Sequence, residues 1–123
     1  MGGKLVGPRE VPMPVFVTQG RFTREYLRGG LAKPEDRHAM IARVCEQAGG
    51  KLLHLYFTMG QHDFLVISEM PDAKAASVLA LVAAGGGGIT DAVTVQAFTS
   101  AEAREMFESA GRIAGSYKPM GAA

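Results

Sequence analysis

Two residues able to take part in acid–base chemistry, His54 and Tyr56, lie two positions apart in the run KLLHLYFT. A histidine titrates near neutral pH and can act as a general base, and a tyrosine hydroxyl can donate a hydrogen bond. Alternate residues of a strand point to the same face, so a strand here would present both side chains together. The pair is a candidate for catalysis or for ligand contact. A histidine that is only hydrogen-bonded inside a cavity also fits the pattern.

A second polar group lies in the segment MGQHD, where Gly60, His62 and Asp63 separate two apolar runs. A glycine in a tight loop often adopts a backbone angle that other residues resist. The Asp63 carboxylate is suited to accept backbone N–H bonds across the turn, which is a structural role. At the mouth of a cavity, Asp63 would instead orient the His62 imidazole.

The other reactive side chains do not suggest a metal or a cofactor. In paired strands His54 and His62 would lie about 13 Å apart, at roughly 3.3 Å per residue. Two ligands of one zinc ion lie far closer, since each Zn–N bond is about 2 Å. Cys45 falls on an apolar helix face and is expected to be a buried, inert thiol. The run Gly85–Gly88 has no following lysine and does not match a phosphate-binding loop. We therefore expect neither a metal nor a cofactor.

The composition is that of one ordinary globular domain. The chain has 123 residues, of which 47% are hydrophobic and 20% charged, and its formal net charge is +1. This charge argues against nucleic acid or an anionic membrane as a partner. No run of about 18 apolar residues predicts a transmembrane helix. With a single cysteine the chain can form no internal disulfide, which is compatible with the cytoplasm.

Start and stop signals divide the chain into alternating strands and helices. The expected elements are, in order, a strand over 15–22, a short helical turn from Thr23 to Gly29-Gly30, a helix from Pro34 to Gly49, strands over 51–58 and 62–69, a helix capped by Asp72, a strand over 89–99, and a helix capped by Ser100. The apolar stripes expected on the three long helices are Ile41, Val44, Cys45 and Ala48; Ala75, Val78, Leu79 and Val82; and Met106, Phe107, Ala110 and Ile113. The order βαββαβ predicts an α+β domain with a ferredoxin-like, four-stranded antiparallel sheet and a further C-terminal helix.

Two long helices cover only one face of such a sheet, and both faces are apolar. We expect Val15, Val17, Leu53, Leu55, Phe57, Leu65, Ile67, Val93 and Val95 to face the helices. The opposite face would then carry Phe16, Thr18, His54, Tyr56, Phe64, Val66, Thr94, Gln96 and Phe98. A three-residue hairpin loop, with Tyr56 opposite Phe64, agrees with this assignment.

The exposed phenylalanines of that second face predict a homodimer or higher homo-oligomer, packed sheet against sheet. Its polar members would line a cavity of mixed character between the sheets. The ligand-cavity candidates are Thr18, His54, Tyr56, Phe64 and Gln96.

The hairpin from Lys51 to Phe64, with Gly60, His62 and Asp63 at its turn, resembles the signature of the GYD-domain family. That family is named for a Gly-x-Tyr-Asp turn, and this chain has His62 where the motif has tyrosine. The opening VFVTQGRFT, the segment AGGK, the Pro-Asp break at 71–72 and the AFT near residue 98 are also similar. The resemblance covers about residues 13–107. It implies a ferredoxin-like dimeric α/β barrel, found mainly in bacteria, with no settled activity.

Three functions fit these observations. The first is a dimeric barrel that binds a small apolar or aromatic molecule between the sheets, or that acts in an assembly. The second, by analogy of fold, is a cofactor-independent monooxygenase with His54 and Tyr56 as acid and base. The third is a pure protein-interaction module. The domain is expected over residues 13–114, between a flexible leader over 1–12 and a flexible tail over 115–123.

Overall fold

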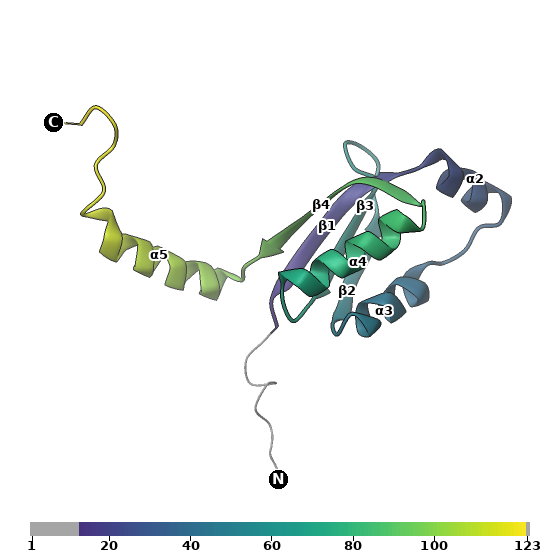
Figure 1. Cartoon of the computed structure of the whole chain (residues 1–123), viewed down its shortest axis with the longest axis horizontal. Helices are drawn as coiled ribbons and strands as arrows, with labels where there is room; N and C mark the ends of the chain where they lie inside the picture. Colours follow the sequence, from purple (N-terminus) through teal and green to yellow (C-terminus); the bar gives the residue numbers. More distant parts are fainter. Residues whose placement is uncertain (1–12, 123) are drawn as a thin grey trace, which may run out of the picture.

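Four strands form one antiparallel sheet in the computed structural model, which describes residues 13–122 of the chain (Figure 1). The strands are β1 (Val15–Phe22), β2 (Lys51–Phe57), β3 (Phe64–Glu69) and β4 (Ile89–Ala97), and their spatial order is β2-β3-β1-β4. All three neighbouring pairs are antiparallel. This order, with helices between β1 and β2 and between β3 and β4, confirms the predicted α+β, ferredoxin-like class.

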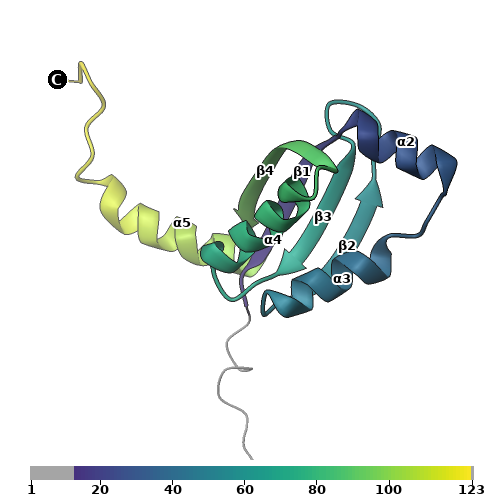
Figure 2. The same cartoon turned by 45° about the vertical axis from the view of Figure 1, so that its right-hand side comes forward.

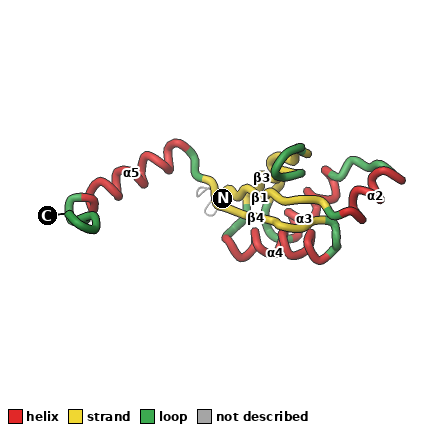
Figure 3. The backbone as a smooth tube through the Cα atoms, turned by 90° about the horizontal axis from the view of Figure 1, so that it is seen from above, coloured by secondary structure: helices red, strands yellow, loops and turns green. Residues whose placement is uncertain are grey.

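Two helices, α3 (His38–Gln47) and α4 (Ala73–Gly85), lie side by side over one face of the sheet (Figures 1 and 2). A shorter helix, α2 (Arg24–Ala32), follows β1 at one end of the sheet. Seen from above, the sheet and these helices form two layers, and the opposite face of the sheet carries no helix of the described chain (Figure 3).

The helix boundaries differ from the predicted ones in three places. Helix α2 does not stop at Gly29 but continues to Ala32. Helix α3 begins at His38 rather than at Pro34, because the Asp36 carboxylate accepts the His38 N–H at 2.9 Å. The last helix, α5 (Ser100–Ala114), is capped by Thr99 and not by Ser100, since Thr99 and Glu102 bond to each other's backbone N–H in a capping box.

The predicted cap and end of the other helices are confirmed. The Asp72 side chain accepts the Ala75 N–H at 2.9 Å and caps α4. Helix α3 ends before Gly49, whose φ of 95° lies in the left-handed region that glycine enters at little cost.

The predicted hairpin register is wrong by one residue. Phe57, not Tyr56, lies opposite Phe64, and Tyr56 lies opposite Leu65. The loop is longer than three residues because the Thr58 N–H donates to the Asp63 carbonyl at 2.9 Å, which leaves four residues between them. A register irregularity in β2 between Leu52 and His54 also shifts the alternation of side chains along that strand.

The predicted assignment of the two faces is therefore wrong for most of the sheet. We call the face of the sheet that no helix covers the open face. Residues of β1 and β3 that were expected on this open face lie under the helices instead, where they are buried with side chains of α3 and α4. This core contains Phe16, Phe64, Val66, Leu52, Cys45, Met70, Ala76 and Leu79. The buried side of α4 also differs from its predicted apolar stripe. Ala76 and Leu79 are buried, whereas Val78 of the predicted stripe is 44% exposed.

The open face carries rows of mainly apolar residues that run across all four strands. One row is His54, Ile67, Val17 and Val95, and the next is Tyr56, Leu65, Gln19 and Val93. Val93 and Val95 are each more than half exposed. The inference of a second apolar face is thus correct, although valine, leucine and isoleucine supply it rather than phenylalanine.

Helix α5 projects from the end of β4, away from the sheet and the other helices (Figures 1 and 3). None of its residues is buried, and Met106, Phe107 and Ile113 are about half exposed or more. The expected leader over 1–12 lies outside the described residues. No helix in the described part of the chain combines the length and the hydropathy needed to cross a membrane.

Candidate functional site

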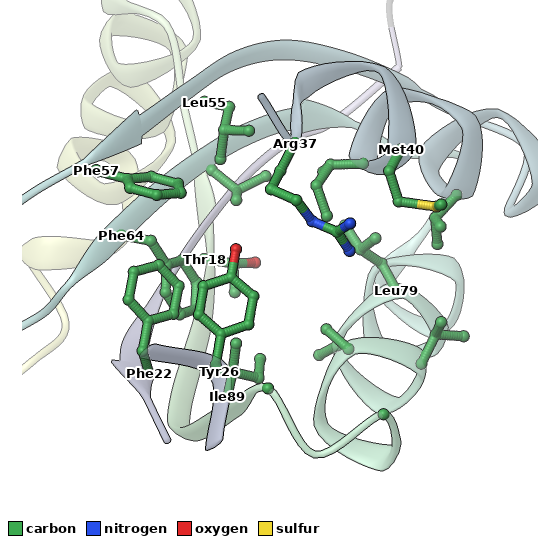
Figure 4. Close-up of a pocket in the computed structure, with 18 residues that line it drawn as sticks. Thr18, Phe22, Tyr26, Arg37, Met40, Leu55, Phe57, Phe64, Leu79 and Ile89 are labelled. Carbon is green, nitrogen blue, oxygen red and sulfur yellow. The ribbon is translucent and has the colours of Figure 1, made fainter. Parts of the chain in front are cut away.

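A cavity of about 280 Å³ lies between the sheet and helices α3 and α4 (Figure 4). The sheet contributes side chains from all four strands, among them Thr18, Leu55, Phe64 and Ile89. The helices contribute aliphatic side chains, such as those of Met40 and Leu79, on the opposite wall. The walls are therefore mostly apolar, as in many small-molecule sites.

An aromatic cluster forms one end of this cavity. The Phe22 ring stacks on Tyr26 with centroids 4.4 Å apart, and it contacts Phe57 edge to face at 5.1 Å and Phe64 at 5.5 Å. Such aromatic pairs stabilise one another beyond the area that they bury. The four rings come from β1, α2, β2 and β3, so the cluster joins three of the four strands to α2.

Hydrogen bonds fix the beginning of α2, and with it the position of Tyr26. The Thr23 hydroxyl accepts the Tyr26 N–H at 3.2 Å and donates to the Gly87 carbonyl at 2.7 Å. The Thr23 N–H donates to the Gly88 carbonyl at 3.0 Å. Gly88 also lies under the Tyr26 ring, since a Cβ at this position would be 2.9 Å from Tyr26 Cδ1. The glycine run that was predicted to end α4 thus forms part of the cavity wall.

Three polar side chains line the cavity at separate points. The Thr18 hydroxyl is hydrogen-bonded to the Thr94 hydroxyl at 2.9 Å. The Tyr26 hydroxyl and the Arg37 guanidinium extend into the space between the aromatic rings and Leu79 (Figure 4). Arg37 also donates from Nη1 to the Glu35 carboxylate at 2.9 Å. The site can therefore enclose an apolar molecule and contact its polar group from the side of Tyr26 and Arg37.

The five predicted cavity residues do not share one cavity in the protomer. Thr18 and Phe64 line the space under the helices. His54 and Tyr56 lie on the open face, with ring centroids 5.9 Å apart and the planes nearly parallel. Gln96 is exposed on β4, opposite Phe16. The shifted hairpin register separates Thr18 and Phe64 from His54 and Tyr56, because opposed residues of paired strands share a face.

The family motif turn has a structural role near the cavity. Gly60 has a φ of 157°, which residues with side chains rarely adopt. The His62 carbonyl accepts the Thr58 hydroxyl at 2.8 Å. The Asp63 carboxylate accepts the Phe22 N–H at 2.9 Å, so it bonds to the backbone of β1 rather than across its own turn. Asp63 thereby holds the strand end that carries the central ring of the aromatic cluster.

Sequence reasoning missed Phe22, Tyr26 and Arg37 as residues of the site. Phe22 directly precedes the Thr23 cap and Tyr26 lies in the first turn after it, where the Thr23 hydroxyl accepts the Tyr26 N–H. That signal was available in the sequence. Arg37 had no such signal, because its position depends on α3 beginning at His38 rather than at Pro34.

The remaining reactive groups lie apart from the cavity. Cys45 is fully buried in the core, and burial, with a smaller contribution from the Glu46 carboxylate, raises the pKa of its thiol. Among residues 13–122 there is no group of three or more His, Cys, Asp or Glu side chains able to hold a metal ion.

Comparison with known proteins agrees with this architecture. A solved structure of a transcriptional regulator from Neisseria meningitidis, in complex with L-methionine, is similar with a TM-score of 0.51 and 16% sequence identity. The match covers 79% of this chain and 58% of the regulator, so this chain spans little more than half of that protein's length. No curated protein matches the sequence significantly. The family model of the GYD domain matches residues 16–107. The chain belongs to the GYD-domain family.

Proposed function

We propose that this protein binds a small apolar molecule in the cavity between its sheet and helices α3 and α4, and that it does so as a homodimer. The observation that carries the proposal is the cavity itself, with about 280 Å³ of space and walls that are largely aromatic and aliphatic. Its size is close to the lower end of the range for small-molecule sites, about 300–1,000 Å³.

The comparison with the Neisseria regulator supports the same class of function. That protein was solved with L-methionine, so a fold of this kind can belong to a protein that binds a small molecule. At 16% identity the likeness concerns the fold, and the ligand of the present protein has to be argued from its own residues.

The proposed ligand position differs from the one expected from sequence, which was between the sheets of two protomers. In the protomer the apolar space is under the helices, whereas His54 and Tyr56 point outward. A contact of these two side chains with a ligand stays a prediction, and it would require a second sheet to cover them.

The open face supports the proposal of a dimer. Its rows of valine, leucine and isoleucine are partly exposed, and the described residues provide no second layer to cover them. Burying such side chains contributes about 1.5–3 kcal/mol each, which favours packing against a second copy.

Two alternatives stay hypotheses. A cofactor-independent monooxygenase would use His54 and Tyr56, whose parallel rings lie 5.9 Å apart on the open face. A pure interaction module would use the same face and helix α5 with no ligand.

The cavity is tested by filling it. Ala83 lines the cavity, while its neighbour Ala84 is exposed and does not. We expect a neutral apolar probe, 3-phenylpropan-1-ol, to shift the amide NMR signals of Val66 and Leu79 in the wild type. The Ala83→Phe variant should lose these shifts, and Ala84→Phe should keep them. Absence of shifts in the wild type, or their persistence in Ala83→Phe, would show the proposal to be wrong.

A further inference from the structure

We propose that the ligand of the cavity is an apolar monocarboxylate, with its carboxylate bound by Arg37 and its apolar body among the aromatic and aliphatic walls. This inference rests on the proposed ligand cavity and names the chemical class that the cavity accepts. Among the described residues that line the cavity, Arg37 is the one with a charged side chain.

Arg37 lies at the mouth of the cavity, which we define as Tyr26, Arg37 and Phe57. These three residues line both the cavity and a groove outside it of about 560 Å³. The Arg37 side chain reaches inward from the start of α3, and its guanidinium lies between Tyr26 and Leu79 (Figure 4). A molecule that fills the cavity from this side would have its outer end at the guanidinium.

The guanidinium has donors available for such a group. It carries five N–H donors in a planar fork that matches a carboxylate. The hydrogen bond from Arg37 Nη1 to the Glu35 carboxylate uses one of these donors. The Glu35 side chain is 50% exposed, so this ion pair is a surface pair of small energetic value. A ligand carboxylate inside the mouth would be better shielded from water and would be held more strongly.

The size and charge of the surroundings narrow the ligand class further. At about 280 Å³ the cavity is close to the lower end of the range for small-molecule sites, about 300–1,000 Å³, so its ligand is small. We take a phenylpropyl group as a small apolar body for the test. In the outer groove Glu25 and Glu35 accompany Lys33, so a second negative charge on the ligand would meet carboxylates there. A monocarboxylate therefore fits better than a dicarboxylate.

The test compares two probes of equal shape, 3-phenylpropanoate and the neutral 3-phenylpropanamide, by amide NMR titration of the full chain. We expect the wild type to bind the carboxylate roughly ten- to a hundredfold more tightly than the amide, as for a hydrogen bond to a charged group. Arg37→Gln should remove this preference while the amide still binds. Arg37→Lys should keep part of it, and Arg43→Gln, an exposed arginine on the same helix, should keep all of it.

Equal affinities of the wild type for the two probes would overturn the carboxylate assignment and leave the cavity proposal intact. The same holds for a preference that survives unchanged in Arg37→Gln. If neither probe binds the wild type, the cavity proposal itself fails. Should Arg37→Gln not fold, Arg37→Lys decides the assignment. The lysine ammonium is a point charge without the planar fork, so this variant must reduce the preference for the carboxylate at least severalfold.

Discussion

Gly88 shows how a residue without a side chain determines the shape of the cavity. Its backbone lies under the Tyr26 ring, and its carbonyl accepts the Thr23 N–H that begins α2. A side chain at this position would push the ring away from the place where it stacks on Phe22.

We expect Gly88→Ala to lower the free energy of unfolding by about 1–3 kcal/mol, the usual cost of overpacking. The matched control is Gly85→Ala, in the same glycine run, where an added Cβ would have no neighbour within 4 Å. That change should be neutral or stabilising by up to about 1 kcal/mol, because alanine favours a helix. Urea denaturation measures both variants, and an equal effect of the two would contradict the proposed contact.

Cys45 gives the stability of the protein a dependence on pH. Burial raises the pKa of its thiol, with a smaller effect of Glu46, whereas the thiol of an unfolded chain ionises near pH 8.5. The folded state therefore keeps its proton to higher pH than the unfolded state. The resulting stabilisation is complete below the unfolded pKa and is lost as the pH rises through the folded pKa.

Between about pH 8 and 10 we expect the free energy of unfolding to fall more steeply for the wild type than for Cys45→Ala. Lysine and tyrosine side chains titrate in both proteins, so the difference between the two slopes isolates the thiol. Parallel slopes in urea denaturation would mean that the thiol has the same pKa in both states.

At the scale of the elements, the loop between β2 and β3 is joined to the end of β1 by Asp63. Its carboxylate accepts the Phe22 N–H, and its own N–H donates to the Gly20 carbonyl at 2.7 Å. The aspartate of the family motif therefore joins the loop between β2 and β3 to the end of β1 that carries Phe22.

Asp63→Ala removes the partner of a half-buried N–H, and we expect a loss of about 1–3 kcal/mol of stability. Gln61→Ala, in the same loop but exposed, should change the stability by less than about 0.5 kcal/mol. Thermal unfolding monitored by circular dichroism compares the two. A midpoint of Asp63→Ala equal to that of the wild type would exclude this role of the carboxylate.

The same loop explains which part of the structure the sequence could predict. Helices and strands were found because their signals are local, such as Asp72 before α4 and the glycines after α3. The hairpin register had no such signal, because Asp63 in the loop bonds to Gly20 and Phe22 of β1, which are distant along the chain. The irregularity in β2 between Leu52 and His54 was not visible in the sequence either. One shifted residue was enough to separate Thr18 and Phe64 from His54 and Tyr56.

The faces of the sheet were ambiguous for a further reason. In β1, Val15 and Val17 alternate with Phe16 and Thr18, so each face has apolar residues. Alternation identifies the two sets without telling which set the helices cover. Arg37, the one charged residue among the described residues that line the cavity, comes from a segment whose helix start was predicted four residues too early.

At the scale of the whole molecule, the open face determines the proposed assembly. Val95 is 53% exposed on the edge strand β4, where it lies opposite Val17 of β1 on that face. A lysine would be solvated there in a single protomer but buried between two sheets.

We expect Val95→Lys to shift the protein from dimer to monomer in sedimentation equilibrium, because an unpaired charge would be buried in the interface. Leu31→Lys is the control, since Leu31 is 84% exposed on α2, away from the open face. It should sediment as the wild type does. A monomeric wild type, or an unchanged Val95→Lys dimer, would contradict the proposed assembly.

Helix α5 has a consequence for spectroscopy. It comprises 15 residues, none of them buried, and isolated helices of about this length are only marginally stable in water. Its helicity would then depend on whatever Met106, Phe107 and Ile113 pack against. If that surface belongs to another molecule, dilution should reduce the magnitude of the ellipticity at 222 nm per residue, although the sheet stays folded. The amount of secondary structure in this protein then becomes a function of its concentration.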